Sequence, residues 1–134
     1  MASGYTYATT VAGSIEEIRA RVEAALKDEG FGILTEIDVA ATLKAKLGLD
    51  RPPYLILGAC NAGLASRALE IDPSIGALLP CNVVLRRSDD LAETIVEIMD
   101  PIAALGIAGA AGVEPIAAEA AERLRRVLDA LGAG

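Results

Sequence analysis

The sequence predicts an α+β domain in which helices pack on one face of a mostly antiparallel sheet. Read in order, its segments suggest a strand, a long helix, several strands and a second long helix. This order lacks the regular alternation of strand and helix that builds a parallel sheet. The chain has 134 residues, of which 53% are hydrophobic. We therefore expect one domain over residues 1–134 with one core.

The first half of the chain contains clear helix signals. Ser14 and Glu17 have the spacing of a capping box, apolar residues recur at helical intervals after them, and Gly30 supplies a stop. Runs of β-branched, aromatic or aliphatic residues indicate the strands. The expected elements here are the strand Tyr5–Val11, the helix that follows Ser14, the strand Gly32–Asp38, the helix Ala40–Leu47, a strand from Tyr54 to about Cys60 and a helix over Ala62–Glu70.

The second half is expected to form a hairpin followed by a helix. The run Cys81–Arg87 reads as a strand, and the β-branched centre of Leu91–Met99 favours the second arm of a hairpin. Asp72 to Gly76 reads as a loop. The Gly/Ala-rich stretch 101–113 is expected to be loop with a helical turn, with a flexible connector at 105–109. The final helix begins near Pro115 and ends at Gly132. Its expected buried stripe comprises Ile116, Ala120, Leu124, Val127, Leu128 and Leu131.

Composition excludes several kinds of chemistry. The chain has no His, so it cannot form a Ser-His-Asp or Cys-His pair or a His-ligated zinc site. Two cysteines make only half a zinc site, and we expect no bound metal. Neither GxGxxG nor a P-loop pattern occurs, and we expect no cofactor. The net charge of −7 opposes nucleic-acid binding, and the basic residues near Arg123 alternate with acids as on a solvated helix face.

The sequence also bears on location. No apolar run approaches the roughly 20 residues that cross a bilayer, so we expect no membrane contact. The first residues lack the basic and apolar regions of a signal peptide. We therefore expect a cytoplasmic protein, in which the two cysteines are reduced thiols.

The pairs Cys60-Asn61 and Cys81-Asn82 contain both cysteines and are the main candidate site. Each pair lies where an apolar run meets a turn or a helix start. A helix beginning after Cys60 would favour its thiolate, and Asn61 could cap that helix or bind a ligand. The alternative is a buried cysteine beside an ordinary cap. If the two strands are neighbours, the pairs could lie close together.

Glu36 and Asp38 are a second candidate. They alternate with Ile37 in a predicted strand, which places both carboxylates on one face. Paired acids can bind a cation or transfer protons. Asp38 also suits the cap of the next helix, and we favour that structural role.

Several segments resemble the domain-of-unknown-function 302 (DUF302) family. They are Gly30–Val39, Thr42–Lys44, Leu57–Asn61 and Leu79–Val84. The likeness covers residues 9–101, which we take as the core of the domain. The predicted C-terminal helix, about 115–131, follows this core in the same domain. It implies a compact α+β domain similar to the TATA-binding-protein-like architecture, and a homodimer. Where the resemblance leads us to expect a proline, the chain has Ala62-Gly63. The resemblance implies no function.

Three functions remain open from the sequence. The leading hypothesis is a small binding or accessory domain that holds an anionic or thiol-reactive molecule. Its pocket would combine Cys60, Asn61, Cys81 and Asn82 with the strand end at Glu36 and Asp38. An alternative is a thiol enzyme or sulfur carrier that uses Cys60 with Cys81. A third is a protein-interaction module without a small-molecule site.

Overall fold

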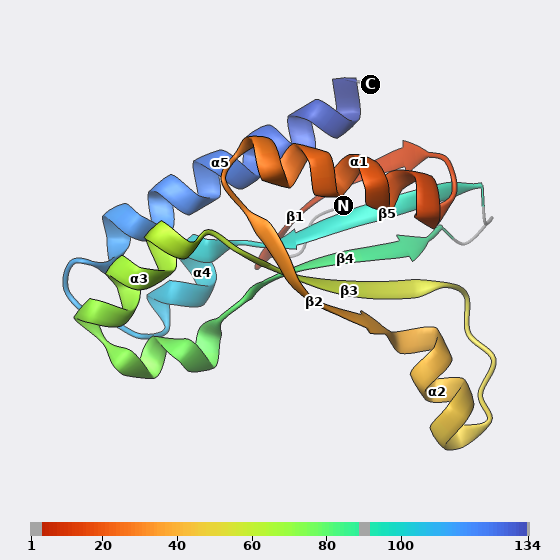
Figure 1. Cartoon of the computed structure of the whole chain (residues 1–134), viewed down its shortest axis with the longest axis horizontal. Coiled ribbons are helices and arrows are strands. Elements are labelled where there is room, and N and C mark those ends of the chain that lie inside the picture. The colour runs from red at the N-terminus through yellow and green to blue at the C-terminus, as the bar shows by residue number, and fades with distance from the viewer. Residues whose placement is uncertain (1–3, 89–91, 134) are drawn as a thin grey trace.

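A computed structural model describes residues 4–88 and 92–133. Its strands form one antiparallel sheet in the order β1-β5-β4-β3-β2 (Figure 1). This sheet, with helices packed on it, confirms the predicted α+β class. The antiparallel pairing of β4 with β5 confirms the predicted hairpin. The strands are β1 (Thr6–Ala12), β2 (Gly32–Asp38), β3 (Tyr54–Cys60), β4 (Cys81–Arg87) and β5 (Glu93–Met99).

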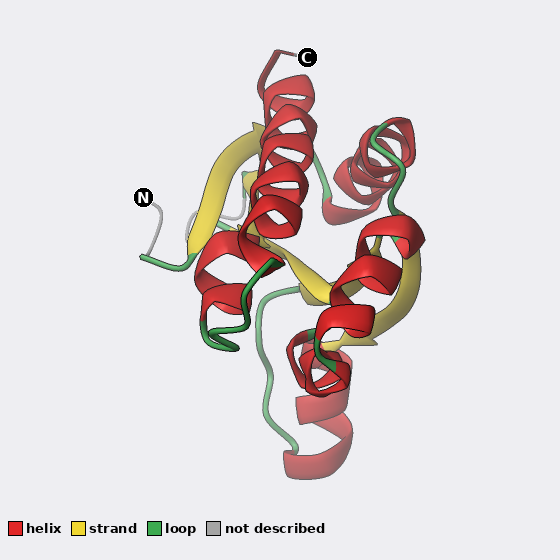
Figure 2. Ribbon diagram, turned by 90° about the vertical axis from the view of Figure 1, so that its left-hand side faces the viewer, coloured by secondary structure: helices red, strands yellow, loops and turns green. Residues whose placement is uncertain are grey.

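The two long helices, α1 and α5, lie on the same side of the sheet (Figure 2). The predicted signals at both ends of α1 are present, because Ser14 and Glu17 form the capping box and Gly30, with a φ of 81°, follows the end of the helix. The helical elements are α1 (Ile15–Asp28), α2 (Val39–Leu47), α3 (Ala62–Ile71), the 3₁₀ helix η1 (Pro73–Leu78), α4 (Pro101–Gly106) and α5 (Val113–Ala133).

The core lies between α1, α5 and the sheet face beneath them. Alternate strand residues point to this face, and they are fully or almost fully buried. All six residues of the stripe predicted for the last helix are also buried. The buried hydrophobic side chains of the strands are Val11, Leu57, Ala59, Val83, Leu85, Val96 and Ile98.

Several predicted boundaries require correction. The last helix begins at Val113 and continues through Gly132, where a stop was expected. The loop expected at 72–76 includes the start of the 3₁₀ helix η1. Leu105, placed in a flexible connector, is buried within α4, because its side chain completes the core against α5. Asp89 and Asp90 of the predicted hairpin turn lie outside the described residues.

Gly58 is an obligatory small residue inside the sheet. It lies opposite Thr35 on β2 and Asn82 on β4. A Cβ atom at this position would overlap Thr35 Oγ1 and lie 2.7 Å from Pro80 Cγ. The side chains of Thr35 and Pro80 thus cover Gly58, which lets the segment before β4 pack against the sheet.

We expect Gly58→Ala to lower the free energy of unfolding by about 1–3 kcal/mol, because the added methyl group overpacks this contact. Urea unfolding followed by circular dichroism measures the change. Gly32→Ala is the matched control in the same sheet, since a Cβ there meets nothing within 4 Å. It should change stability by less than about 0.5 kcal/mol. Equal losses in both variants would contradict the close-approach explanation.

Candidate functional site

The two thiols lie at one end of the β3–β4 pair. Cys60 is the last residue of β3, Cys81 is the first residue of β4, and Cys81 pairs with Ala59. Both cysteines are free and partly exposed. The neighbouring strands β3 and β4 therefore place both cysteines at the same end of the sheet.

A small apolar cavity adjoins both thiols. Its volume is about 30 Å³. None of the described residues that line it carries a charge. The lining includes Phe31 from the α1–β2 loop, Leu64, Ala65 and Ala68 from α3, Leu105 from α4, and Ile116 and Ala120 from α5. The site is thus a pair of thiols in a hydrocarbon environment.

The two thiols differ in their surroundings. Burial raises the pKa of Cys81 to about 11, and the neighbouring Cys60 contributes a smaller rise through charge repulsion. Cys81 is therefore a neutral thiol near neutral pH. Cys60 instead precedes the start of α3, where the helix dipole favours negative charge.

Asn61 holds the start of α3 next to Cys60, as the sequence predicted. Its Oδ1 accepts a hydrogen bond from the backbone N–H of Leu64 at 3.1 Å. Gly30, with a φ of 81°, lies against the amide of Asn61, and a Cβ there would be 2.9 Å from Nδ2. Asn61 therefore has a structural role at the edge of the cavity.

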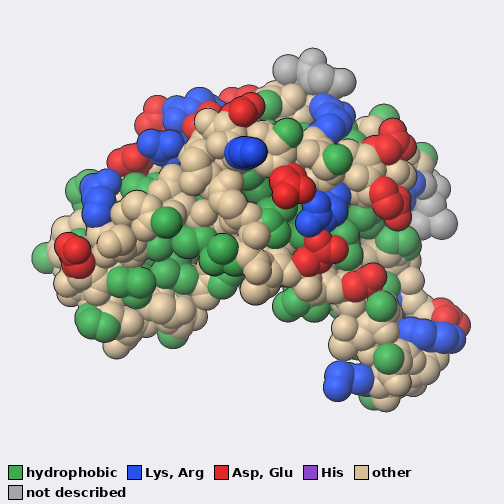
Figure 3. All heavy atoms as spheres, in the orientation of Figure 1, with side chains coloured by type: hydrophobic (Ala, Val, Ile, Leu, Met, Phe, Trp, Pro, Cys, Tyr) green, Lys and Arg blue, Asp and Glu red, His purple; other side chains and the backbone are tan. Residues whose placement is uncertain are grey.

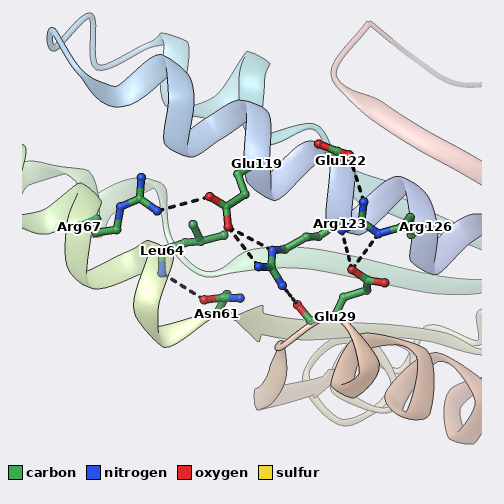
Figure 4. Close-up of polar contacts among 8 residues, drawn as sticks. All are labelled: Glu29, Asn61, Leu64, Arg67, Glu119, Glu122, Arg123 and Arg126. Carbon is green, nitrogen blue, oxygen red and sulfur yellow. Dashed lines mark hydrogen bonds and ion pairs between the residues drawn. The ribbon is translucent and has the colours of Figure 1, made fainter.

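An ion-pair network joins α5 to the ends of α1 and α3 beside Asn61 (Figure 4). Arg123 donates to the carbonyl of Glu29 at 3.0 Å and also pairs with Glu119, which contacts Arg67 of α3. Arg126 pairs with the Glu29 carboxylate at 2.9 Å. The alternation of basic and acidic residues predicts a solvated helix face here, whereas these arginines connect α5 to α1 and α3. The i,i+4 spacing of Glu119 and Arg123 was the available signal.

Asn82 does not join the thiols. It pairs with Gly58 and faces the side of the sheet opposite α1 and α5, because side chains alternate along β4. It lines a separate hollow of about 390 Å³ with Tyr5, Pro80 and Met99.

Glu36 and Asp38 also lie away from the thiols. Asp38 pairs with Leu55, whereas Cys60 pairs with Gly32 at the other end of β2. Six residues at a rise of about 3.4 Å separate these ends by about 20 Å. The two carboxylates line a cleft of about 430 Å³ that also involves α1.

Both carboxylates already have partners in that cleft. Glu36 pairs with Arg19 at 2.6 Å. Asp38 accepts a hydrogen bond from the N–H of Ala41 at 2.9 Å, which confirms the favoured capping role. Of the six candidate residues, the structure therefore brings together only Cys60, Asn61 and Cys81.

Among the described residues, 4–88 and 92–133, no group of three or more His, Cys, Asp or Glu side chains has the arrangement needed to hold a metal ion. None of the helices in this described part of the chain has the length and apolar character needed to span a membrane.

The family model described as "Domain of unknown function DUF302" matches residues 7–131. The chain belongs to the DUF302 family. The matched range extends beyond the resemblance at 9–101 and includes most of α5. The chain is also similar to the structure titled "Crystal structure of uncharacterized conserved protein DUF302 from Bacillus stearothermophilus". The identity is 32%, the TM-score is 0.88, and the match covers 96% of this chain and 99% of the other. No protein with a curated description matches the chain.

The raised pKa of Cys81 predicts a slow, strongly pH-dependent alkylation in this DUF302 domain. With a pKa of about 11, against an ordinary value of 9.0, its thiolate fraction at pH 8 is about 100-fold below that of an ordinary thiol. Iodoacetamide labelling of Cys81, read by peptide mass spectrometry, should accelerate about tenfold per pH unit from pH 8 to 10. The urea-unfolded chain is the control. A native rate at pH 8 equal to the unfolded rate would contradict the assignment.

Proposed function

We propose that this DUF302 domain is a binding domain that holds a small thiol-reactive ligand at Cys60. The observation that carries the proposal is the pair of thiols beside an uncharged cavity of about 30 Å³. The ligand attaches through the Cys60 sulfur, and its reactive end enters the cavity. Cys81 forms part of the wall as a neutral thiol.

The size and polarity of the cavity limit the ligand. A cavity needs about 10–15 Å³ to hold one water molecule, so a cavity of about 30 Å³ holds little more than one. The group that enters is therefore one or two heavy atoms in size. The apolar wall favours an uncharged group, because burying an unpaired anion costs several kcal/mol or more. These properties favour the thiol-reactive ligand over the anionic one.

A thiol-exchange or sulfur-carrier role is the second candidate, favoured by the closeness of the two cysteines. In the loading step the Cys60 thiolate attacks the outer sulfur of a persulfide donor, R–S–SH. A Cys60 persulfide forms and the thiolate R–S⁻ leaves. Attack by the Cys81 thiol on the inner sulfur then gives a Cys60–Cys81 disulfide and releases H₂S. The raised pKa of Cys81 slows this second step, so the carrier remains loaded.

The remaining expectations from the resemblance and the composition form part of the same proposal. The TATA-binding-protein-like architecture is proposed as a likeness of fold without a shared role, because a net charge of −7 opposes binding to phosphate backbones. The domain is proposed to act in the cytoplasm without a cofactor.

Methyl methanethiosulfonate tests the proposal because it delivers a group of two heavy atoms. The Cys60 thiolate attacks its sulfenyl sulfur, a methyl disulfide forms and methanesulfinate leaves. We expect this reagent to modify Cys60 before Cys81. The comparison reagent is 5,5′-dithiobis(2-nitrobenzoate), which is bulky and charged. The ratio of the Cys60 modification rate with methyl methanethiosulfonate to that with this reagent should be at least tenfold larger in the folded domain than in the unfolded chain. Peptide mass spectrometry measures both rates at each cysteine.

A cavity-filling variant separates pocket binding from simple exposure. Ala65→Leu fills the cavity and should slow methylthiolation of Cys60 by tenfold or more. Ala118→Leu is the control, because Ala118 is exposed on α5 and does not line the cavity. Thermal unfolding checks that both variants fold. Unchanged labelling of Cys60 in a folded Ala65→Leu variant would overturn the proposal.

A further inference from the structure

β1 forms one edge of the sheet and lies beside α5 (Figure 2). It pairs with β5 in one continuous register over all seven of its residues. Its sequence contains no charged residue and no proline. Exposed edge strands normally carry a bulge, a charge or a proline, because their unpaired backbone groups otherwise bind another strand. β1 is therefore an unprotected edge.

The opposite edge, β2, is protected. Its pairing with β3 shifts register between Ile33 and Thr35, and it carries the carboxylates of Glu36 and Asp38. Figure 3 shows acidic and basic side chains gathered where β2 meets α1 and α2. α2 also follows directly on the end of β2 (Figure 1). The contrast between the two edges marks β1 as the one that can accept a further strand.

The register of β1 identifies the backbone groups that face outward. The N–H of Asp100 donates to the carbonyl of Tyr5 at 2.8 Å, so these two residues form a hydrogen-bonded pair. Such pairs alternate in an antiparallel ladder, and every second residue of β1 from Tyr7 onward therefore bonds to β5. Ala8 and Thr10 lie between them and point their N–H and C=O groups away from the sheet. These are the groups to which an added strand bonds.

A groove of about 560 Å³ lies beside this edge, between β1 and α5. Tyr7, Ala8 and Thr9 line its β1 side, and Arg125 and Asp129 belong to its α5 side. The side chains of Tyr7 and Thr9 alternate with that of Ala8, so they lie on the helix side of the sheet. Every second side chain of a strand added to β1 would lie beside them, in the groove.

Arg125 and Asp129 give the groove one exposed charge of each sign. Their i,i+4 spacing suits an ion pair. Among residues 4–88 and 92–133, however, neither has an oppositely charged partner. The guanidinium of Arg125 instead lies over the Tyr7 ring, 4.8 Å from its centre, and donates to the Tyr7 hydroxyl at 3.3 Å. Both charges are thus available to a bound molecule.

The spacing of these two charges matches that of a strand. Four residues of a helix rise about 6 Å, and alternate residues of a strand lie about 7 Å apart. Arg125 lies at the Tyr7 end of the groove, whereas Gly132 lies near Thr9, since a Cβ there would be 3.8 Å from Thr9 Oγ1. Asp129 lies between them along α5. A strand antiparallel to β1 therefore reaches Asp129 first and Arg125 second.

We propose that β1 binds an extended segment of another protein as a sixth, antiparallel strand, which carries a basic residue and, two positions later, an acidic residue in the groove. Backbone pairing with Ala8 and Thr10 supplies affinity, and Asp129 and Arg125 select the order of the two charges. β1 of a second copy fits less well, because it has no charge to offer. The groove shares no lining residue with the thiol cavity, so the inference is independent of the proposed function.

Fluorescence anisotropy with the labelled peptide Thr-Val-Lys-Val-Glu-Val-Thr tests the proposal. We expect saturable binding, about fivefold or more tighter than that of the same peptide with Lys and Glu exchanged. The double variant Arg125→Glu with Asp129→Lys should reverse this preference. Asp50→Lys with Arg51→Glu is the matched control, because it exchanges the same charges on exposed residues outside the groove and should preserve the preference. Circular dichroism checks that both variants fold.

N-methylated peptides separate strand pairing from a contact between charges alone. Methylating the N–H of the central Val, which faces Ala8, removes a ladder hydrogen bond and should weaken binding about tenfold or more. Methylating the N–H of Glu, which points away from β1, should change the affinity less than about threefold.

Three results with the peptides would each overturn the proposal: equal losses from both methylations, equal affinity for the two charge orders, or no saturable binding up to about 1 mM. Sedimentation equilibrium and amide hydrogen exchange supply a fourth. A dimer that the peptide leaves intact, with the amides of Ala8 and Thr10 protected, would show that a second copy holds this edge.

Discussion

The structure depends first on the register between β3 and β4. That register sets Ala59 opposite Cys81 and Gly58 opposite Asn82, and it buries Leu57, Val83 and Leu85 under α1 and α5. A slip of one residue would turn each of these side chains to the other face of the sheet. The same pairing that closes the core therefore also brings the two thiols to one end of the sheet. In this register Pro80, just before β4, lies close over Gly58.

The features that could be predicted from the sequence are mostly local. Ser14, Asp38 and Asn61 act through hydrogen bonds within three residues, so their capping roles can be recognised from spacing alone. The buried stripe of α5 follows from a period of 3.6 residues in the same way. Hairpin β4–β5 was predictable because a short turn forces its two strands to be neighbours.

The candidate site was only half predictable because it depends on strand direction. Antiparallel pairing places the end of β2 beside the start of β3, so Glu36 and Asp38 lie away from Cys60. Asn82 leaves the site for a different reason, since adjacent residues of a strand point to opposite faces. The cavity wall comes largely from α3, α4 and α5, and ordinary Leu, Ile and Ala residues give no sign of it in the sequence. The Gly/Ala-rich stretch contributes Leu105 to that wall, although its composition is typical of a loop.

The lack of buried residues in α2 has a consequence for how this domain can diverge during evolution. Most sequence changes in a helix without core contacts change the folding free energy of the domain little. Large losses of stability come mainly from defects in the core. α2 can therefore change its length, charge or apolar edge while the sheet and the thiol cavity stay intact. Within the family, such drift would alter the surface that the domain presents faster than it alters the chemistry that the domain contains.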